Sequence, residues 1–177
     1  MNRKKQVLRN LVILFVVILF FMRLFALHLS PLSVLENAER SLHYGPSEVV
    51  HVEEHPGGKY ILGRYDKWFS FYRIDRVYFF LWRLGGINIG NQIDLSESIS
   101  YSGGATQSSQ EIYGIINDNR IKKVEVLLTD GTVLSQAEFY DSMFLFTLQE
   151  PYEDKWKYKD LRAYDSENNL IYEEELY

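Results

Sequence analysis

A five-residue string, HVEEH at residues 51–55, matches the H-x-x-E-H pattern of inverted zinc peptidases. In those enzymes the string lies on a helix, so two histidines four residues apart share one face and bind one metal ion. This match makes an exported metal-dependent hydrolase, using His51, Glu54 and His55, the alternative interpretation of the chain.

The residues around this string favour a strand over a helix. Residues 48–54 read EVVHVEE, which is rich in β-branched valine, and Pro56 stops a helix directly afterwards. Histidines four apart in a strand are separated by about 13 Å, too far for one shared ion. We therefore predict no metal ligand, no catalytic residue and no cofactor here, and expect His51, Glu53 and His55 on the solvent-facing side of the strand.

The stretch from residue 59 to residue 83 combines aromatic and basic side chains. It contains ten aromatic residues, and six basic residues against two acidic ones. Most aromatic residues of this kind form a core, but exposed aromatic patches usually mark contacts. We therefore take Trp68, Tyr72, Tyr78 and Trp82 as candidate binding residues, either in a platform for a glycan or in a surface close to lipid headgroups.

The N-terminal segment has the charge pattern of a membrane anchor. Residues 1–10 carry four basic residues and no acid, and an unbroken apolar run, LVILFVVILFFM, follows at residues 11–22. A basic flank before an apolar helix predicts a single span of the cell membrane with a cytoplasmic N-terminus. We expect residues 7–29 to contact the membrane and everything after Ser30 to be extracytoplasmic, with the Arg23 guanidinium reaching the headgroups.

A cleaved signal peptide is the other interpretation of this segment, because an apolar run of about 12 residues suits that class. Cleavage sites carry small residues spaced A-x-A. The sequence RLFALHLS at residues 23–30 offers no such pair, since Ala26 is matched only by Leu24 or His28. We therefore expect the segment to be retained.

Composition limits what the rest of the chain can be. Of the 177 residues, 147 follow Ser30, enough for one ordinary domain or two small ones. The chain has no cysteine, which excludes disulfides and a lipid-modified cysteine, and it has no N-x-S/T sequon. Both absences fit a bacterial envelope protein. All 24 acidic residues follow Ser30 and outnumber 14 basic ones there, so nucleic-acid binding is not expected.

The pattern after the anchor predicts a short helix and then an antiparallel meander. Ser30 is an N-cap candidate, Pro31 suits the first helical position, and Gly45-Pro46 ends the helix. Strand 48–54 is followed by three β-rich runs with almost no spacer, at residues 60–65, 67–74 and 76–84. Gly85-Gly86 is expected to end this meander.

The remainder predicts a second β unit after a linker. Residues 102–110, SGGATQSSQ, contain no aliphatic side chain larger than alanine and suggest a linker. Residues 111–177 follow, with a strong hairpin signal at Asp130-Gly131, and their short strands suggest a small Ig-like β-sandwich. The predicted protein is therefore mainly β. It comprises the anchor at residues 1–29, the helix and meander at 30–101, the linker, and the sandwich-like unit.

This plan resembles that of small, membrane-anchored, uncharacterised proteins of Gram-positive spore-forming bacteria. The resemblance rests on SPLSVLENAERS, EVVHVEEHPGGKYIL, FFLWRL, IYGIINDNRIKKVEVLLTDG and LRAYDSENNLIYE, which together cover most of the predicted exported part. These motifs are structural and the family has no assigned activity, so the resemblance implies topology and little else.

Other catalytic signatures do not occur in the sequence. It has no G-x-S-x-G elbow, no cysteine nucleophile and no phosphate-binding loop. The sequence therefore predicts a membrane-tethered, extracytoplasmic module with a binding or supporting role, whose partner is an envelope protein or a glycan.

Overall fold

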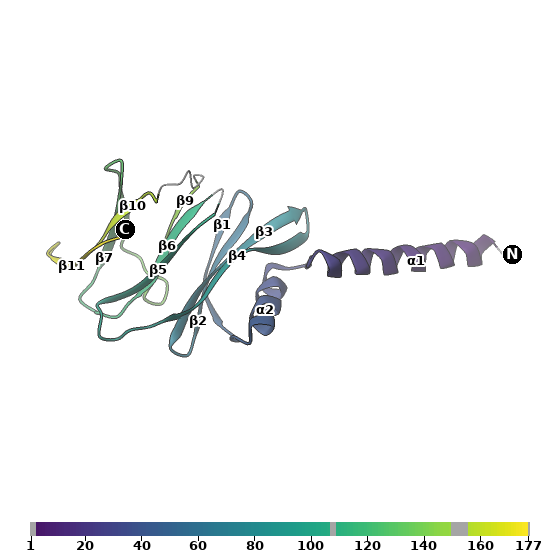
Figure 1. The fold of residues 1–177 in the computed structure, drawn as a ribbon, viewed down its shortest axis with the longest axis horizontal. Coiled ribbons are helices and arrows are strands. Elements are labelled where there is room, and N and C mark those ends of the chain that lie inside the picture. Colours follow the sequence, from purple (N-terminus) through teal and green to yellow (C-terminus); the bar gives the residue numbers. More distant parts are fainter. Residues whose placement is uncertain (1–2, 107–108, 150–155, 177) are drawn as a thin grey trace.

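The computed structural model describes residues 3–106, 109–149 and 156–176. The protein is mainly β: an N-terminal apolar helix and a second, short helix are followed by three antiparallel sheets (Figure 1). The helices are α1 (Arg3–Leu24) and α2 (Pro31–Leu42).

The first sheet has the strand order β1–β2–β3–β4, a meander, as the short loops predict. Its strands are β1 (Glu48–His55), β2 (Gly58–Tyr65), β3 (Trp68–Tyr78) and β4 (Leu81–Gln92). The middle sheet has the order β5–β6–β9, from β5 (Ile99–Ala105), β6 (Gln110–Ile116) and β9 (Met143–Leu148). The third sheet has the order β11–β10–β7–β8, from β7 (Lys123–Leu128), β8 (Val133–Gln136), β10 (Tyr158–Tyr164) and β11 (Leu170–Glu175).

These elements stack in four layers, with a core between each pair of neighbours (Figure 1). Val34 and Leu35 of α2 pack on the first sheet. The first and middle sheets enclose a core that includes Phe71 and Tyr113, and the middle and third sheets enclose another that includes Phe144 and Leu161. The middle sheet is therefore covered on both faces, and its strands β6 and β9 are almost continuously buried.

Helix α2 begins where the sequence predicts. The Ser30 hydroxyl accepts a hydrogen bond from the Ser33 backbone N–H at 3.2 Å, and Pro31 occupies the first helical position. One carboxylate of this helix, Glu39, is buried and accepts a hydrogen bond of 2.6 Å from the Tyr72 hydroxyl of β3. The hydrogen bond and the apolar face together hold α2 on the first sheet.

The alternation of β3 accounts for its aromatic residues on both faces. Phe69 and Phe71 point toward the middle sheet, whereas Tyr72 and Ile74 point toward α2. Each face therefore has its cover within the chain.

The meander differs from the prediction at two places. Strand β3 continues through Asp75 to Tyr78, and the chain turns at Phe79-Phe80, inside the predicted strand 76–84. Gly85-Gly86 lies within β4. A Cβ at Gly85 would come within 2.5 Å of the Asp75 carboxylate on the neighbouring strand, so the position favours glycine. That glycine provides close approach and does not break the strand.

The segment 102–110, predicted as a linker, contributes to the middle sheet. Residues 102–105 belong to β5 and Gln110 begins β6, while residues 107–108 lie outside the described residues. A Cβ at Gly103 would come within 3.0 Å of the Trp156 ring, so this glycine lets an aromatic ring pack on the strand. The predicted boundary after residue 101 therefore falls inside a strand.

Candidate functional site

The junction between α1 and the β domain is held by specific backbone hydrogen bonds. After α1, Ala26 adopts the left-handed conformation, with φ of 48°. The Leu27 backbone N–H donates to the Met22 carbonyl at 2.8 Å, which satisfies a terminal carbonyl of the helix. The helix therefore ends in a left-handed turn with a paired terminal carbonyl, a few residues before α2 begins at Pro31.

Two backbone hydrogen bonds join this junction to the first sheet. The His28 N–H donates to the Trp82 carbonyl at 2.8 Å, and the Trp82 N–H donates to the His28 carbonyl at 2.9 Å. The Trp82 ring is buried among α2 and β2–β3 side chains, with the Arg76 guanidinium 4.7 Å from its centroid. Trp82 thus ties the end of α1 to the β3–β4 hairpin.

The turn of that hairpin carries exposed aromatic side chains. Tyr78 and Phe80 are each 64% exposed, and Phe79 is 98% exposed. In Figure 1 the hairpin reaches toward the side of the molecule from which α1 projects. We call Tyr78, Phe79 and Phe80 the aromatic tip.

The four predicted binding residues do not share one open surface. Tyr72 is buried between the first sheet and α2, and Trp82 is buried beside it. Trp68 is half-buried, with the Lys67 ammonium 5.3 Å from its ring, and Tyr78 is exposed at the aromatic tip. Tyr72 and Trp82 therefore serve the core, while Tyr78 lies beside the exposed Phe79 and Phe80, which the sequence interpretation did not single out.

The HVEEH string lies on β1, as its valines predict. Its histidines were expected on the solvent-facing side, and this was wrong. His51 stacks on Tyr140 with ring centroids 3.4 Å apart, and His55 stacks on Tyr60 at 4.3 Å. Burial lowers the pKa of both imidazoles, so the rings are neutral at pH 7 and pack against the aromatic rings.

The strand also separates the three residues that a hydrolase would need. Glu54 is exposed and pairs with Lys59 across the β1–β2 hairpin, while His51 and His55 lie on the other, half-buried side. In the described part of the chain, no group of three His, Cys, Asp or Glu side chains is placed to hold a metal ion. The geometry therefore gives the inverted-peptidase pattern no support.

We expect the purified full-length chain to contain no stoichiometric zinc, because a strand keeps the two imidazoles apart. Elemental analysis of the chain and of a His55→Ala variant should give the same background metal content. Stoichiometric zinc that is lost in His55→Ala would restore the hydrolase interpretation.

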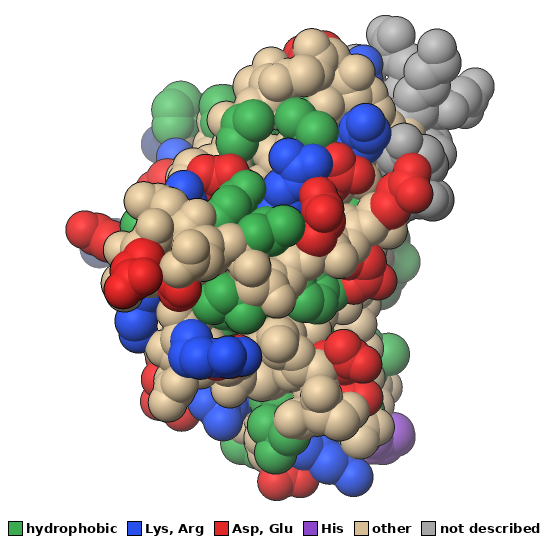
Figure 2. All heavy atoms as spheres, turned by 90° about the vertical axis from the view of Figure 1, so that its left-hand side faces the viewer, with side chains coloured by type: hydrophobic (Ala, Val, Ile, Leu, Met, Phe, Trp, Pro, Cys, Tyr) green, Lys and Arg blue, Asp and Glu red, His purple; other side chains and the backbone are tan. Residues whose placement is uncertain are grey.

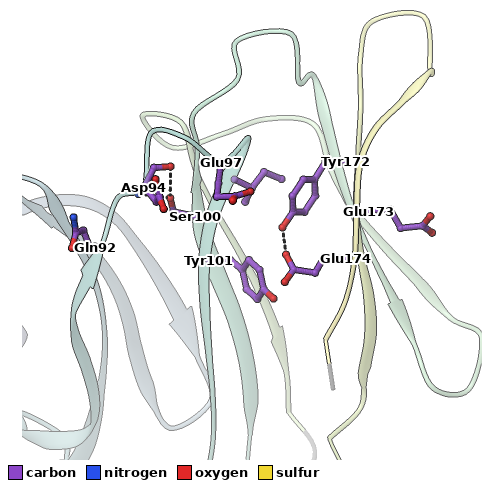
Figure 3. A pocket seen from close by; sticks show the side chains of 9 residues that line it. Gln92, Asp94, Glu97, Ser100, Tyr101, Tyr172, Glu173 and Glu174 are labelled. Carbon is purple, nitrogen blue, oxygen red and sulfur yellow. Dashed lines mark hydrogen bonds between the residues drawn. The ribbon is translucent and has the colours of Figure 1, made fainter.

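An open pocket at the far end of the fold is acidic. It has a volume of about 580 Å³ and lies between the β4–β5 connection and β11 (Figure 3). The carboxylates of Asp94, Glu97 and Glu174 line it, and the Tyr172 hydroxyl donates to Glu174. The Glu173 side chain points away from the pocket and accepts a hydrogen bond from Arg162 at 2.7 Å (Figure 3). Acidic side chains and tyrosines suit a cationic ligand.

A second group of charges lies between the first and middle sheets, where Arg73 and Asp75 are half-buried and Glu111 is buried. The Arg73 guanidinium donates to Asp75 at 3.0 Å, to Thr106 at 2.7 Å and to Ser109 at 3.1 Å. Glu111 on β6 is 6% exposed, and burial raises its pKa to about 7. The local sequence QEIYGII does not indicate that this carboxylate is buried. The residues that bury it belong to the first sheet, which is distant in the sequence.

Comparison of the chain with protein-family models, with curated proteins and with solved structures gives no match.

Proposed function

We propose that the protein is a single-pass membrane protein of the cell envelope, whose β domain is held outside the cytoplasm by α1. The observation that carries this proposal is α1 itself. It has 22 residues, it is the one helix in the described residues long and apolar enough to cross a membrane, and none of its side chains is buried. An apolar helix without a protein cover is stable only in lipid or against a partner.

The charge distribution supports the orientation. Arg3, Lys4, Lys5 and Arg9 precede the apolar run, and all 24 acidic residues follow Ser30. Basic residues remain on the cytoplasmic side, so the acidic β domain lies on the other side.

We propose a binding or supporting role for the β domain, acting on an envelope protein or a glycan. The strand geometry of His51 and His55 argues against a metal-dependent hydrolase. Two antiparallel sheets around one core also fit a loosely Ig-like sandwich, a form common in binding domains, although here the sandwich includes β5 and so begins before residue 111. The resemblance to membrane-anchored proteins of Gram-positive spore formers supports the same topology.

We expect the full-length chain to stay in the membrane, because residues 23–30 lack a small-x-small pair. Fractionation of cells that express a C-terminally tagged chain should leave one full-length species in the membrane fraction. A Leu24→Ala variant, which creates Ala-x-Ala at residues 24–26, is the matched control that introduces a cleavage signal. Release of a wild-type product that starts between residues 27 and 32 would contradict the proposal.

A further inference from the structure

Exposed apolar side chains gather at the end of the domain that α1 enters. Leu29 and Leu32 at the start of α2 are 68% and 52% exposed, and the aromatic tip lies on the neighbouring hairpin. Figure 2 shows the opposite face, which points away from α1: acidic and basic side chains are interspersed there, and hydrophobic ones form small patches. The cluster of exposed apolar side chains therefore lies on the side of the anchor, whereas Leu95, Val133 and Leu170 are exposed on other elements.

The turn residues themselves are unusual for a hairpin in water. Two-residue turns normally carry glycine, asparagine or aspartate, whose conformations suit the turn and whose side chains are compatible with solvent. Here both turn positions are phenylalanine, and neither has a positive φ. Turn geometry does not account for these residues, but contact with an apolar medium does.

The length of α1 places the membrane surface at this hairpin. Thirteen residues separate Arg9 from Arg23, which puts the two arginines roughly 21 Å apart along the helix axis. The hydrocarbon core of a bilayer is about 30 Å thick. If the two arginines lie at equal distances from the bilayer centre, the hydrocarbon core reaches about three residues beyond each of them. The outer boundary then falls near Ala26, two residues before the backbone bonds between His28 and Trp82.

The charges beside the tip suit lipid headgroups. Arg76 and Arg83, on β3 and β4, are both exposed and flank the aromatic residues. The acidic pocket lined by the carboxylates of Asp94, Glu97 and Glu174 involves β11, a strand of the third sheet, which lies at the other end of the stack (Figure 1). Aromatic residues with adjacent arginines are the usual composition of a membrane interface.

We propose that Phe79 and Phe80, with Tyr78, insert into the headgroup–acyl boundary of the bilayer that α1 spans. This inference rests on the proposed function, because it takes α1 as the anchor. The domain then has two membrane attachments joined by the His28–Trp82 bonds. Two attachments fix the tilt of the sheets, so the acidic pocket faces away from the membrane.

The absence of native cysteine allows a direct test with single-cysteine variants of the full-length chain. Phe79→Cys, Leu95→Cys and Val16→Cys each carry a polarity-sensitive fluorophore, in vesicles of phosphatidylglycerol and phosphatidylethanolamine. Leu95 is the matched control, because it is apolar and 82% exposed but lies beside the acidic pocket. The label at residue 79 should emit at shorter wavelength than the label at 95. It should also be quenched by a spin label near the lipid carbonyls, and quenched several-fold less by aqueous iodide.

The other outcomes separate this inference from the anchor. Equal iodide quenching at residues 79 and 95, with residue 16 protected, overturns the tip insertion and leaves the anchor intact. Quenching of residue 16 by iodide overturns the anchor and the inference together. Protection of residue 79 in native membranes but not in pure lipid vesicles assigns the tip to a protein partner and contradicts the lipid contact.

Discussion

The substitution Trp82→Ala should lower the free energy of unfolding by about 3–5 kcal/mol, the range for large aromatic truncations in cores. The Trp82 ring is 7% exposed and packs with Val34, Leu35 and Ile74. It also lies under the Arg76 guanidinium, a contact that alanine loses. The cavity would open between α2 and the first sheet, where the backbone bonds to His28 hold the end of α1.

Denaturant unfolding of the full-length chain in detergent micelles, followed by circular dichroism, measures this effect. Leu95→Ala is the control, since it removes an exposed apolar side chain and should change the free energy of unfolding by less than about 0.5 kcal/mol. A Trp82→Ala effect as small as that of the control would mean that Trp82 is a surface residue and that it does not belong to a core beneath α2.

The substitution Glu111→Gln should stabilise the protein at alkaline pH. The folded-state pKa of Glu111, about 7, lies above the unfolded value of about 4.3, so the folded state retains a proton that the unfolded state has lost. The contribution of the Glu111 carboxyl to the free energy of unfolding is greatest below about pH 4, where the group is protonated in both states. This contribution falls between the two pKa values and is lost above about pH 8. Glutamine stays neutral, so its advantage over glutamate should grow to about 4 kcal/mol above pH 8.

Unfolding free energies of the wild type and Glu111→Gln, measured from pH 5 to pH 9, test the sign and the size. Glu138→Gln removes the same charge from an exposed position and is the matched control. A Glu111→Gln variant that is less stable than the wild type at pH 9 would show that the carboxylate is ionised and paired with Arg73.

The sequence predicts most of the regular structure because local rules decide it. Ser30 and Pro31 place the start of α2, and Asp130-Gly131 places the β7–β8 turn, where Gly131 has a φ of 90°. The turn at Phe79-Phe80 could not be predicted, because neither residue is a turn former and the surrounding pattern is that of a strand. Its departure from local preference is also what points to the membrane.

The errors at the histidines and the linker arise from contacts between distant parts of the chain. His51 is covered by Tyr140, a residue that no local pattern associates with β1. Gly103 and Gly104 resemble a flexible linker in composition, but they allow Trp156 and Glu111 to approach β5 closely. The buried Glu111 was missed for the same reason, since its cover comes from the first sheet.

The topology of the single span is the central claim, and cysteine labelling in intact cells tests it most directly. Lys5→Cys and Leu95→Cys each introduce one thiol into a chain that has none. A membrane-impermeant maleimide should label residue 95 in intact cells and residue 5 only after the cells are permeabilised, with both variants in the membrane fraction at full length. Labelling of residue 5 but not residue 95 in intact cells would contradict a β domain held outside the membrane by α1.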